Sequence, residues 1–138
     1  MPAIGDILLY KNFEFEDGTK KDKLCIALNN SSSKIPCLFL ITTSQSRHYP
    51  NINPGCNFNK KLFFIPVQWK AFFSVDTYIQ LPMINELRTY DLHSNKFADQ
   101  ISVRGNLPDE VNYKLIQCLR LFRDDISDQH WNIIFPDS

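Results

Sequence analysis

Short apolar segments separated by polar turns constrain the fold of this chain more than any other feature. The first segment covers residues 5–10, the second residues 24–30 and the third residues 37–45. Asp17-Gly18 provides a turn signal between the first two, and a Ser-rich stretch at residues 29–34 separates the second from the third. Apolar runs of this length with such short connections predict an antiparallel meander.

The same pattern extends the predicted sheet along the chain. Phe13 and Phe15 alternate with Glu14 and Glu16, the period of a half-buried strand, and a break is expected near Lys11. We expect residues 44–61, which contain two prolines and a glycine, to be an irregular connection, and residues 83–92 to form a short helix or strand. Strands are predicted over residues 4–15, 23–30, 35–43, 62–67, 76–81 and 101–104.

A single clear helix is predicted after Pro108. Proline suits the first helical turn, and the acidic residues Asp109 and Glu110 complement the helix dipole. An apolar stripe on this helix predicts that it packs across the sheet; it consists of Val111, Leu115, Cys118, Leu119 and Phe122. The apolar tail at residues 128–136 is expected to add an edge strand or join an oligomer interface. The predicted fold is therefore mainly β with a C-terminal helix, a strongly bent antiparallel sheet or small barrel.

Composition limits the classes of function. A chain of 138 residues with 43% hydrophobic content fits one domain, residues 1–138, with its own core. A net charge of zero argues against a strong nucleic-acid field, although a local basic patch remains compatible with it. The absence of an apolar run near the roughly 20 residues that span a bilayer, and of a signal-peptide pattern, predicts a cytoplasmic protein without membrane contact.

The cysteine pattern predicts structural rather than metal-binding roles. None of the four cysteines forms a C-x-x-C pair. Cys25 and Cys37 lie in apolar strands and Cys118 on the apolar helix face, where a free thiol acts as a small hydrophobe. A zinc site built from His48 and Cys56 would lack a recognised ligand spacing. No metal and no cofactor is predicted.

The third apolar segment carries the strongest functional signal. It changes from buried character to Thr42-Thr43-Ser44-Gln45 within one residue. A strand that ends in hydroxyl and amide side chains presents them at the rim of a sheet, where ligands commonly meet a rigid scaffold.

The order of short motifs resembles the MazF/PemK-like toxin family over roughly residues 5–122. The motifs that carry the resemblance are Gly5-Asp6-Ile7-Leu8, Lys23-Leu24-Cys25-Ile26-Ala27-Leu28, Thr42-Thr43-Ser44-Gln45, Thr77-Tyr78-Ile79-Gln80-Leu81, Asn85-Glu86-Leu87-Arg88-Thr89 and Gly105-Asn106-Leu107-Pro108.

The resemblance implies an SH3-like half-open antiparallel barrel of the MazF/PemK (CcdB-like) kind. It also implies a homodimer that cleaves single-stranded RNA without a metal and is held in check by a cognate antitoxin protein. By residue matching, Lys23 takes the place of the family arginine and Thr43 that of the family hydroxyl, with Thr42 as the alternative. The chain departs from the family at Lys23-Leu24, where the pattern has Arg-Pro, and lysine lacks the rigid fork that arginine offers to phosphate.

Metal-independent RNA cleavage requires a proton acceptor, a proton donor and charge stabilisation at the phosphate. Lysines supply charge, hydroxyl and amide groups hold phosphate, and a histidine suits proton transfer near neutrality. The predicted catalytic residues are Lys23, Thr43, Ser44 and His48, and the predicted RNA contacts are Lys20, Lys21, Gln45 and Arg47. Aromatic candidates for base stacking are Tyr49, Phe58 and Trp69.

Each of these residues also has a structural interpretation. The lysines alternate with Asp17 and Asp22, as in a solvated hairpin loop, and the threonines suit a strand by propensity alone. His48 and Arg47 fit an exposed loop equally well. The alternative function is therefore a catalytically inactive binding module on the same fold, which takes a protein or peptide partner.

Overall fold

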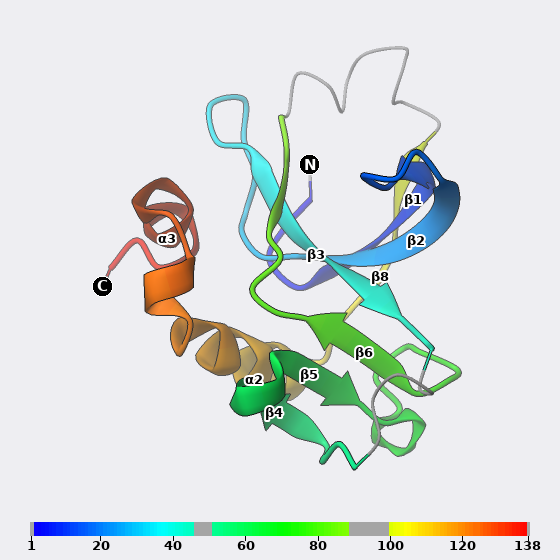
Figure 1. The fold of residues 1–138 in the computed structure, drawn as a ribbon. Helices are drawn as coiled ribbons and strands as arrows, with labels where there is room; N and C mark the ends of the chain where they lie inside the picture. Colours follow the sequence, from blue (N-terminus) through cyan, green and yellow to red (C-terminus); the bar gives the residue numbers. More distant parts are fainter. Residues whose placement is uncertain (1, 46–50, 89–99, 138) are drawn as a thin grey trace.

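A computed structural model describes residues 2–45, 51–88 and 100–137 (Figure 1). Within these ranges the chain forms an eight-stranded antiparallel sheet that does not close, together with two α-helices. The prediction of a mainly β fold with a C-terminal helix is therefore confirmed. The strands follow the order β4-β5-β6-β3-β2-β1-β8, with β7 paired to β3 off this path.

The first three strands form the predicted meander. They are β1 (Asp6–Glu14), β2 (Lys20–Ala27) and β3 (Cys37–Thr43). The β1–β2 register shifts between Tyr10 and Phe13, where Asn12 has a φ of 55° and its backbone N–H donates to Asp22 Oδ1 at 2.9 Å. Asparagine tolerates this left-handed conformation, and the break expected near Lys11 is instead a shift of register within one continuous strand.

The β3 strand connects the two parts of the bent sheet. Its first residues, Cys37 to Phe39, pair with β7, and its last two, Thr42 and Thr43, pair with Ile79 and Tyr78 of β6. Figure 1 shows β3 between the β1–β2 pair and the β5–β6 pair. The remaining strands are β4 (Gly55–Asn57), β5 (Leu62–Ile65), β6 (Thr77–Gln80), β7 (Asn85–Leu87) and β8 (Ile101–Asn106).

The β4 strand corrects one prediction. Residues 44–61 were expected to be irregular, but Gly55–Asn57 pairs with β5. A strand of three residues that includes glycine has too little periodicity to be recognised in sequence, and its conformation is set by the neighbouring strand. Short 3₁₀ turns at Phe58–Lys60, Val67–Trp69 and Arg123–Asp125 complete the connections.

Helix α2 (Asp109–Arg120) begins directly after Pro108, as predicted. The tail, in contrast, forms a second helix, α3 (Asp128–Ile134), so the prediction of an edge strand there is wrong. Ser127 caps this helix, because its Oγ accepts the backbone N–H of His130 at 3.1 Å. The apolar tail residues belong to the core of the chain itself: Trp131, Ile134 and Phe135 are at most 7% exposed.

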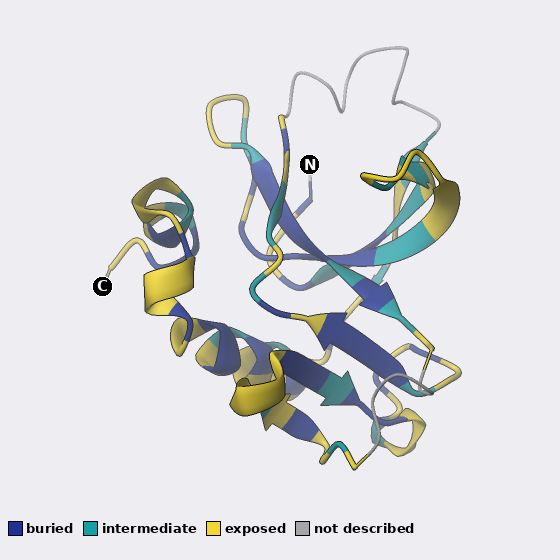
Figure 2. Cartoon of the chain, in the orientation of Figure 1, coloured by how far each residue is buried: buried dark blue, intermediate teal, exposed yellow. Residues whose placement is uncertain are grey.

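Two clusters of buried side chains cover opposite faces of the sheet. Ile7 and Ile26 belong to the larger cluster, which includes both helices, whereas Leu8 and Cys25 belong to the smaller one. Adjacent residues in a strand point to opposite faces, so the inner part of β2 is buried on both sides and reads as a continuous apolar run. Figure 2 shows that exposure increases toward the β1–β2 turn.

The cysteines divide into two kinds. Cys25 and Cys37 are free and buried, as expected. Cys118 is buried too, but it forms a disulfide with Cys56 across 62 residues of sequence, so its assignment as a free thiol is wrong. This pairing depends on how β4 lies against α2 and cannot be deduced from spacing alone. Among the described residues, no helix is both long and apolar enough to cross a bilayer.

Candidate functional site

The end of β3 opens onto a cavity of about 730 Å³, called the rim cavity below. Its wall comes from four places: the end of β1 with the turn after it, Lys23 of β2, the last residues of β3, and the chain around Gln80 to Asn85. Three of the residues predicted from sequence, Lys23, Thr43 and Gln45, line it together. The antiparallel pairing of β2 with β3 brings the start of one strand to the end of the other.

The two threonines at the end of β3 have different surroundings. Thr42 is 6% exposed, and its hydroxyl donates to the backbone carbonyl of Leu24 at 2.9 Å. Thr43 is half-buried, and its Oγ1 accepts the backbone N–H of Gln45 at 3.3 Å. The Thr42 hydroxyl is therefore committed to joining β2 and β3, whereas the Thr43 hydroxyl retains its proton for a ligand in the rim cavity.

Lys23 places an ammonium group beside the end of β3. Its Nζ lies 3.5 Å from the Thr42 carbonyl oxygen and 5.7 Å from the centroid of the Phe15 ring. Partial burial is the main cause that lowers the pKa of Lys23 below its usual 10.5, and the nearby Lys21 ammonium lowers it further. The site thus holds a partly buried cation near an aromatic ring, where its charge is screened less by solvent than that of an exposed lysine.

Carboxylates also line the rim cavity. Glu14, Glu16 and Asp17 belong to its wall, so three acidic side chains accompany one lysine. The side-chain hydrogen bond from Thr19, followed by the backbone N–H of the same residue, lowers the pKa of Asp17. The part of the wall that the structure describes is therefore negative in sum, which opposes a polyanion unless further cationic groups contribute.

The other predicted residues lie elsewhere. Lys20 and Lys21 are exposed at the start of β2, opposite Glu14 and Phe13, and neither belongs to the rim cavity wall. Ser44 is exposed and also outside that wall. Arg47, His48 and Tyr49, for which the sequence predicts catalytic or RNA-contacting roles, lie outside the described residues.

Phe58 and Trp69, which the sequence suggests as base-stacking residues, do not line the rim cavity. The Phe58 ring lies 4.8 Å from the Phe122 ring, and Trp69 borders a different cavity. The aromatic rings of the rim cavity are instead Phe13 and Phe15, whose centroids are 5.2 Å apart. Their alternation with glutamates predicts one shared strand face, but the cavity wall also includes Glu14 and Glu16, which the alternation places on the other face.

Two amide side chains of the rim cavity had no functional assignment from sequence. Gln80 ends β6, and Asn85 begins β7. A polar residue at the end of an alternating strand was the available signal for Gln80. Amides both donate and accept hydrogen bonds, which suits them to nucleobase edges or peptide groups. Among the described residues, no group of three His, Cys, Asp or Glu side chains could hold a metal ion.

No protein-family model matches the chain, and no curated protein sequence matches it significantly.

Proposed function

We propose that this chain is a toxin-like, metal-independent endoribonuclease that cleaves single-stranded RNA at the rim cavity. The order of the MazF/PemK-like motifs supports the proposal, as do the bent open sheet and C-terminal helices, which are compatible with an SH3-like half-open barrel. One observation carries it: the ammonium of Lys23 lies 3.5 Å from the Thr42 carbonyl, in the cavity that Thr43 and Gln45 also line. A homodimer and a cognate antitoxin protein belong to the same proposal.

The proposed reaction uses the RNA's own 2′-hydroxyl as the nucleophile. As the 2′-oxygen attacks the adjacent phosphorus, negative charge grows on the phosphate oxygens, and the Lys23 ammonium and the Thr43 hydroxyl stabilise it. The bond between phosphorus and the 5′-oxygen then breaks, which gives a 2′,3′-cyclic phosphate. The leaving 5′-oxygen takes up one proton and becomes a hydroxyl, which balances the proton lost by the 2′-hydroxyl. The amide of Gln45 fixes the phosphate. For proton transfer, His48 is the candidate from sequence, and the carboxylates of Glu14 and Glu16 line the cavity as alternative acceptors.

Cleavage of a long, mostly unstructured RNA in EDTA tests this function. We expect discrete cuts with the wild type and a loss of about 100-fold or more in Lys23→Ala and Thr43→Ala, because each variant removes one group that stabilises the developing charge. Lys34→Ala is the matched control, since Lys34 is exposed and does not line the rim cavity. RNA left intact by correctly folded wild type would refute the proposal.

The acidic wall favours a second function, a non-catalytic module that binds a peptide or protein partner. Glu14, Glu16 and Asp17 attract a cationic residue, and Phe13 with Met83 offers apolar contact beside them. Replacement of the family arginine by lysine agrees with this alternative. Titration with an extended peptide that carries lysine and leucine tests it: the module predicts binding that weakens in Glu14→Gln/Glu16→Gln, while the ribonuclease predicts none.

A further inference from the structure

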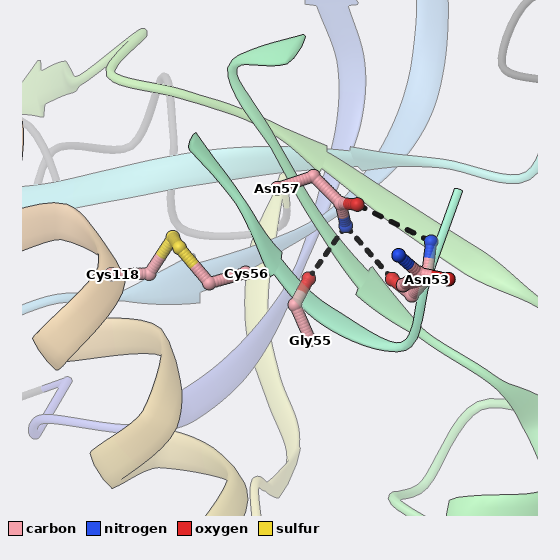
Figure 3. The surroundings of a disulfide bond; sticks show 5 residues. All are labelled: Asn53, Gly55, Cys56, Asn57 and Cys118. Carbon is pink, nitrogen blue, oxygen red and sulfur yellow. Dashed lines mark hydrogen bonds between the residues drawn. A yellow bond between two sulfur atoms is a disulfide. The ribbon is translucent and has the colours of Figure 1, made fainter. Parts of the chain in front are cut away.

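The disulfide between Cys56 and Cys118 joins the outer strand of the sheet to helix α2 (Figure 3). Cys56 is exposed, whereas Cys118 is 2% exposed on the buried face of the helix. Both cysteines line an open cavity of about 400 Å³, separate from the rim cavity, together with Gly55, Trp69 and Lys114. A reagent in this cavity therefore approaches the bond from the Cys56 side.

The side-chain hydrogen bonds of Asn57 lie within the segment around β4 itself. Asn57 Nδ2 donates to the carbonyls of Asn53 at 2.8 Å and Gly55 at 3.0 Å, and the Asn53 backbone N–H donates to Asn57 Oδ1 at 3.2 Å (Figure 3). Attachment to the rest of the fold comes from the pairing with β5, from the Phe58 ring against Phe122 and from the disulfide. Without the covalent bond, the pairing of three residues with β5 and the contact of Phe58 with Phe122 remain to hold this segment at the sheet edge.

The other two cysteines cannot take part in thiol exchange while the protein is folded. Cys25 and Cys37 are both 0% exposed, and burial raises the pKa of each to about 12. The thiolate is the reactive form of cysteine, and both access and ionisation suppress it here. Thiol chemistry in the native chain is therefore confined to the Cys56–Cys118 pair.

We propose that the Cys56–Cys118 bond is a reversible thiol–disulfide exchange site, which a dithiol reductant opens in the folded protein. A thiolate of the dithiol attacks the sulfur of Cys56, the more exposed of the two residues, and the Cys118 sulfur leaves with the electron pair of the broken bond and takes up a proton. The second thiol of the dithiol loses its proton, attacks the mixed disulfide and displaces the Cys56 sulfur, which is protonated in turn. The protein gains two electrons and two protons, and the dithiol becomes a disulfide.

Opening this bond affects the sheet that forms part of the rim cavity. Asn57 pairs with Leu62, and Leu62 pairs with Gln80, which lines the rim cavity. One row of paired residues thus runs from the disulfide strand to that cavity. When β4 is released from α2, β5 becomes the edge strand of the sheet. The backbone amides of β5 are then less protected from hydrogen exchange. The proposal holds whatever the rim cavity binds.

Differential alkylation tests the exchange directly. The native protein is treated with dithiothreitol and then with iodoacetamide, and the label on each cysteine is measured by peptide mass spectrometry. We expect Cys56 and Cys118 to be labelled together, at least about tenfold faster than Cys25 and Cys37. Oxidised glutathione should restore the bond. Hydrogen exchange should become faster at residues 55–57 and 62–65 in the reduced form, while the inner part of β2 stays unchanged.

The double variant Cys56→Ser/Cys118→Ser is the matched control, and it should show the exchange pattern of the reduced form with no response to dithiothreitol. If this variant does not fold, circular dichroism of the reduced wild type takes its place, and native spectra are expected. Free thiols at both positions in protein isolated without reductant would overturn the proposal. So would labelling of all four cysteines at one rate, which would mean that the bond opens only when the whole chain unfolds.

Discussion

Lys23 combines a cost in stability with a proposed role in charge stabilisation. Its pKa is lowered in the folded protein by partial burial, so the folded state holds the proton less tightly than the unfolded state does. The free energy of unfolding therefore rises as pH increases from the lowered pKa toward 10.5, and below that interval the charged side chain is a destabilising group. A residue kept at such a cost beside an open cavity is a candidate for function.

Replacement of Lys23 by methionine should therefore separate stability from activity. Lys23→Met retains the apolar stem and removes the charge, so we expect a Tm about 1–2 °C higher at pH 7, a small change because the side chain is only partly buried. We also expect RNA cleavage to disappear. Calorimetry beside a cleavage assay measures both effects. A lower Tm together with unchanged cleavage would remove Lys23 from the site.

Thr42 and Thr43 allow the effects on stability and on cleavage to be measured separately at neighbouring positions. Thr42→Val removes the donor to the Leu24 carbonyl and should cost about 1 kcal/mol, or roughly 3–6 °C in Tm. Thr43→Val should leave Tm within about 1 °C and reduce cleavage about 100-fold or more. Thermal unfolding and initial cleavage rates of both variants distinguish the roles. The opposite assignment, with cleavage lost in Thr42→Val alone, would shift the proposed hydroxyl by one residue.

The helices and strands that could be predicted from sequence have a clear hydrophobic periodicity or are bounded by turn and capping residues. The alternation of Phe13 and Phe15 with glutamates, the polar end of β3 and the proline before α2 are all local signals, and all three elements are present. The β4 strand and the α3 helix depend on what they pack against. In particular, the run Ile133-Ile134-Phe135 has β propensity, but Ser127 caps a helix there and Trp131 fixes it in the core.

The site follows the same division. Lys23 and Thr43 could be predicted by matching the motifs of the resemblance, and Gln45 from the polar end of the third apolar segment. The antiparallel pairing of β2 with β3 then brings these residues to one cavity. Gln80 and Asn85 could not, since they reach the rim cavity through pairing of β6 and β7 with β3. Likewise, the Cys56–Cys118 bond depends on the approach of an edge strand to a helix, which no spacing rule encodes.

Truncation of Trp131 tests the role of α3. This side chain is 7% exposed, its ring lies 4.2 Å from Phe135, and the Arg123 guanidinium lies 4.7 Å from it. We expect Trp131→Ala to cost about 3 kcal/mol, with a Tm lower by roughly 10 °C, because it leaves a cavity in the core. Thermal unfolding combined with light scattering measures the effect. A changed molecular mass at unchanged Tm would instead place this residue in a subunit interface.

At the scale of the whole molecule, charge limits the proposed RNA binding. The chain has no net charge, and the described residues of the rim cavity wall include more carboxylates than lysines, so we expect few and local phosphate contacts. With Lys20, Lys21 and Lys23 as the contacts, the logarithm of the binding constant should fall with the logarithm of salt concentration with a slope of about −2, since each phosphate contact to a single strand contributes about −0.7.

Fluorescence anisotropy with a labelled single-stranded RNA, measured at several salt concentrations, gives this slope. Lys20→Ala should make the slope less steep by about 0.7, and Lys34→Ala should leave it unchanged. A slope near zero would mean that binding does not involve phosphate, and would favour the peptide-binding alternative.

The most direct test of the central claim is cleavage in EDTA of two matched RNAs with one known cut site, of which one carries a 2′-deoxy nucleotide at that site. We expect the all-RNA substrate to be cut to a 2′,3′-cyclic phosphate and a 5′-hydroxyl, and the deoxy substrate to bind equally well without being cut. Cleavage of both substrates, or of neither, would contradict it.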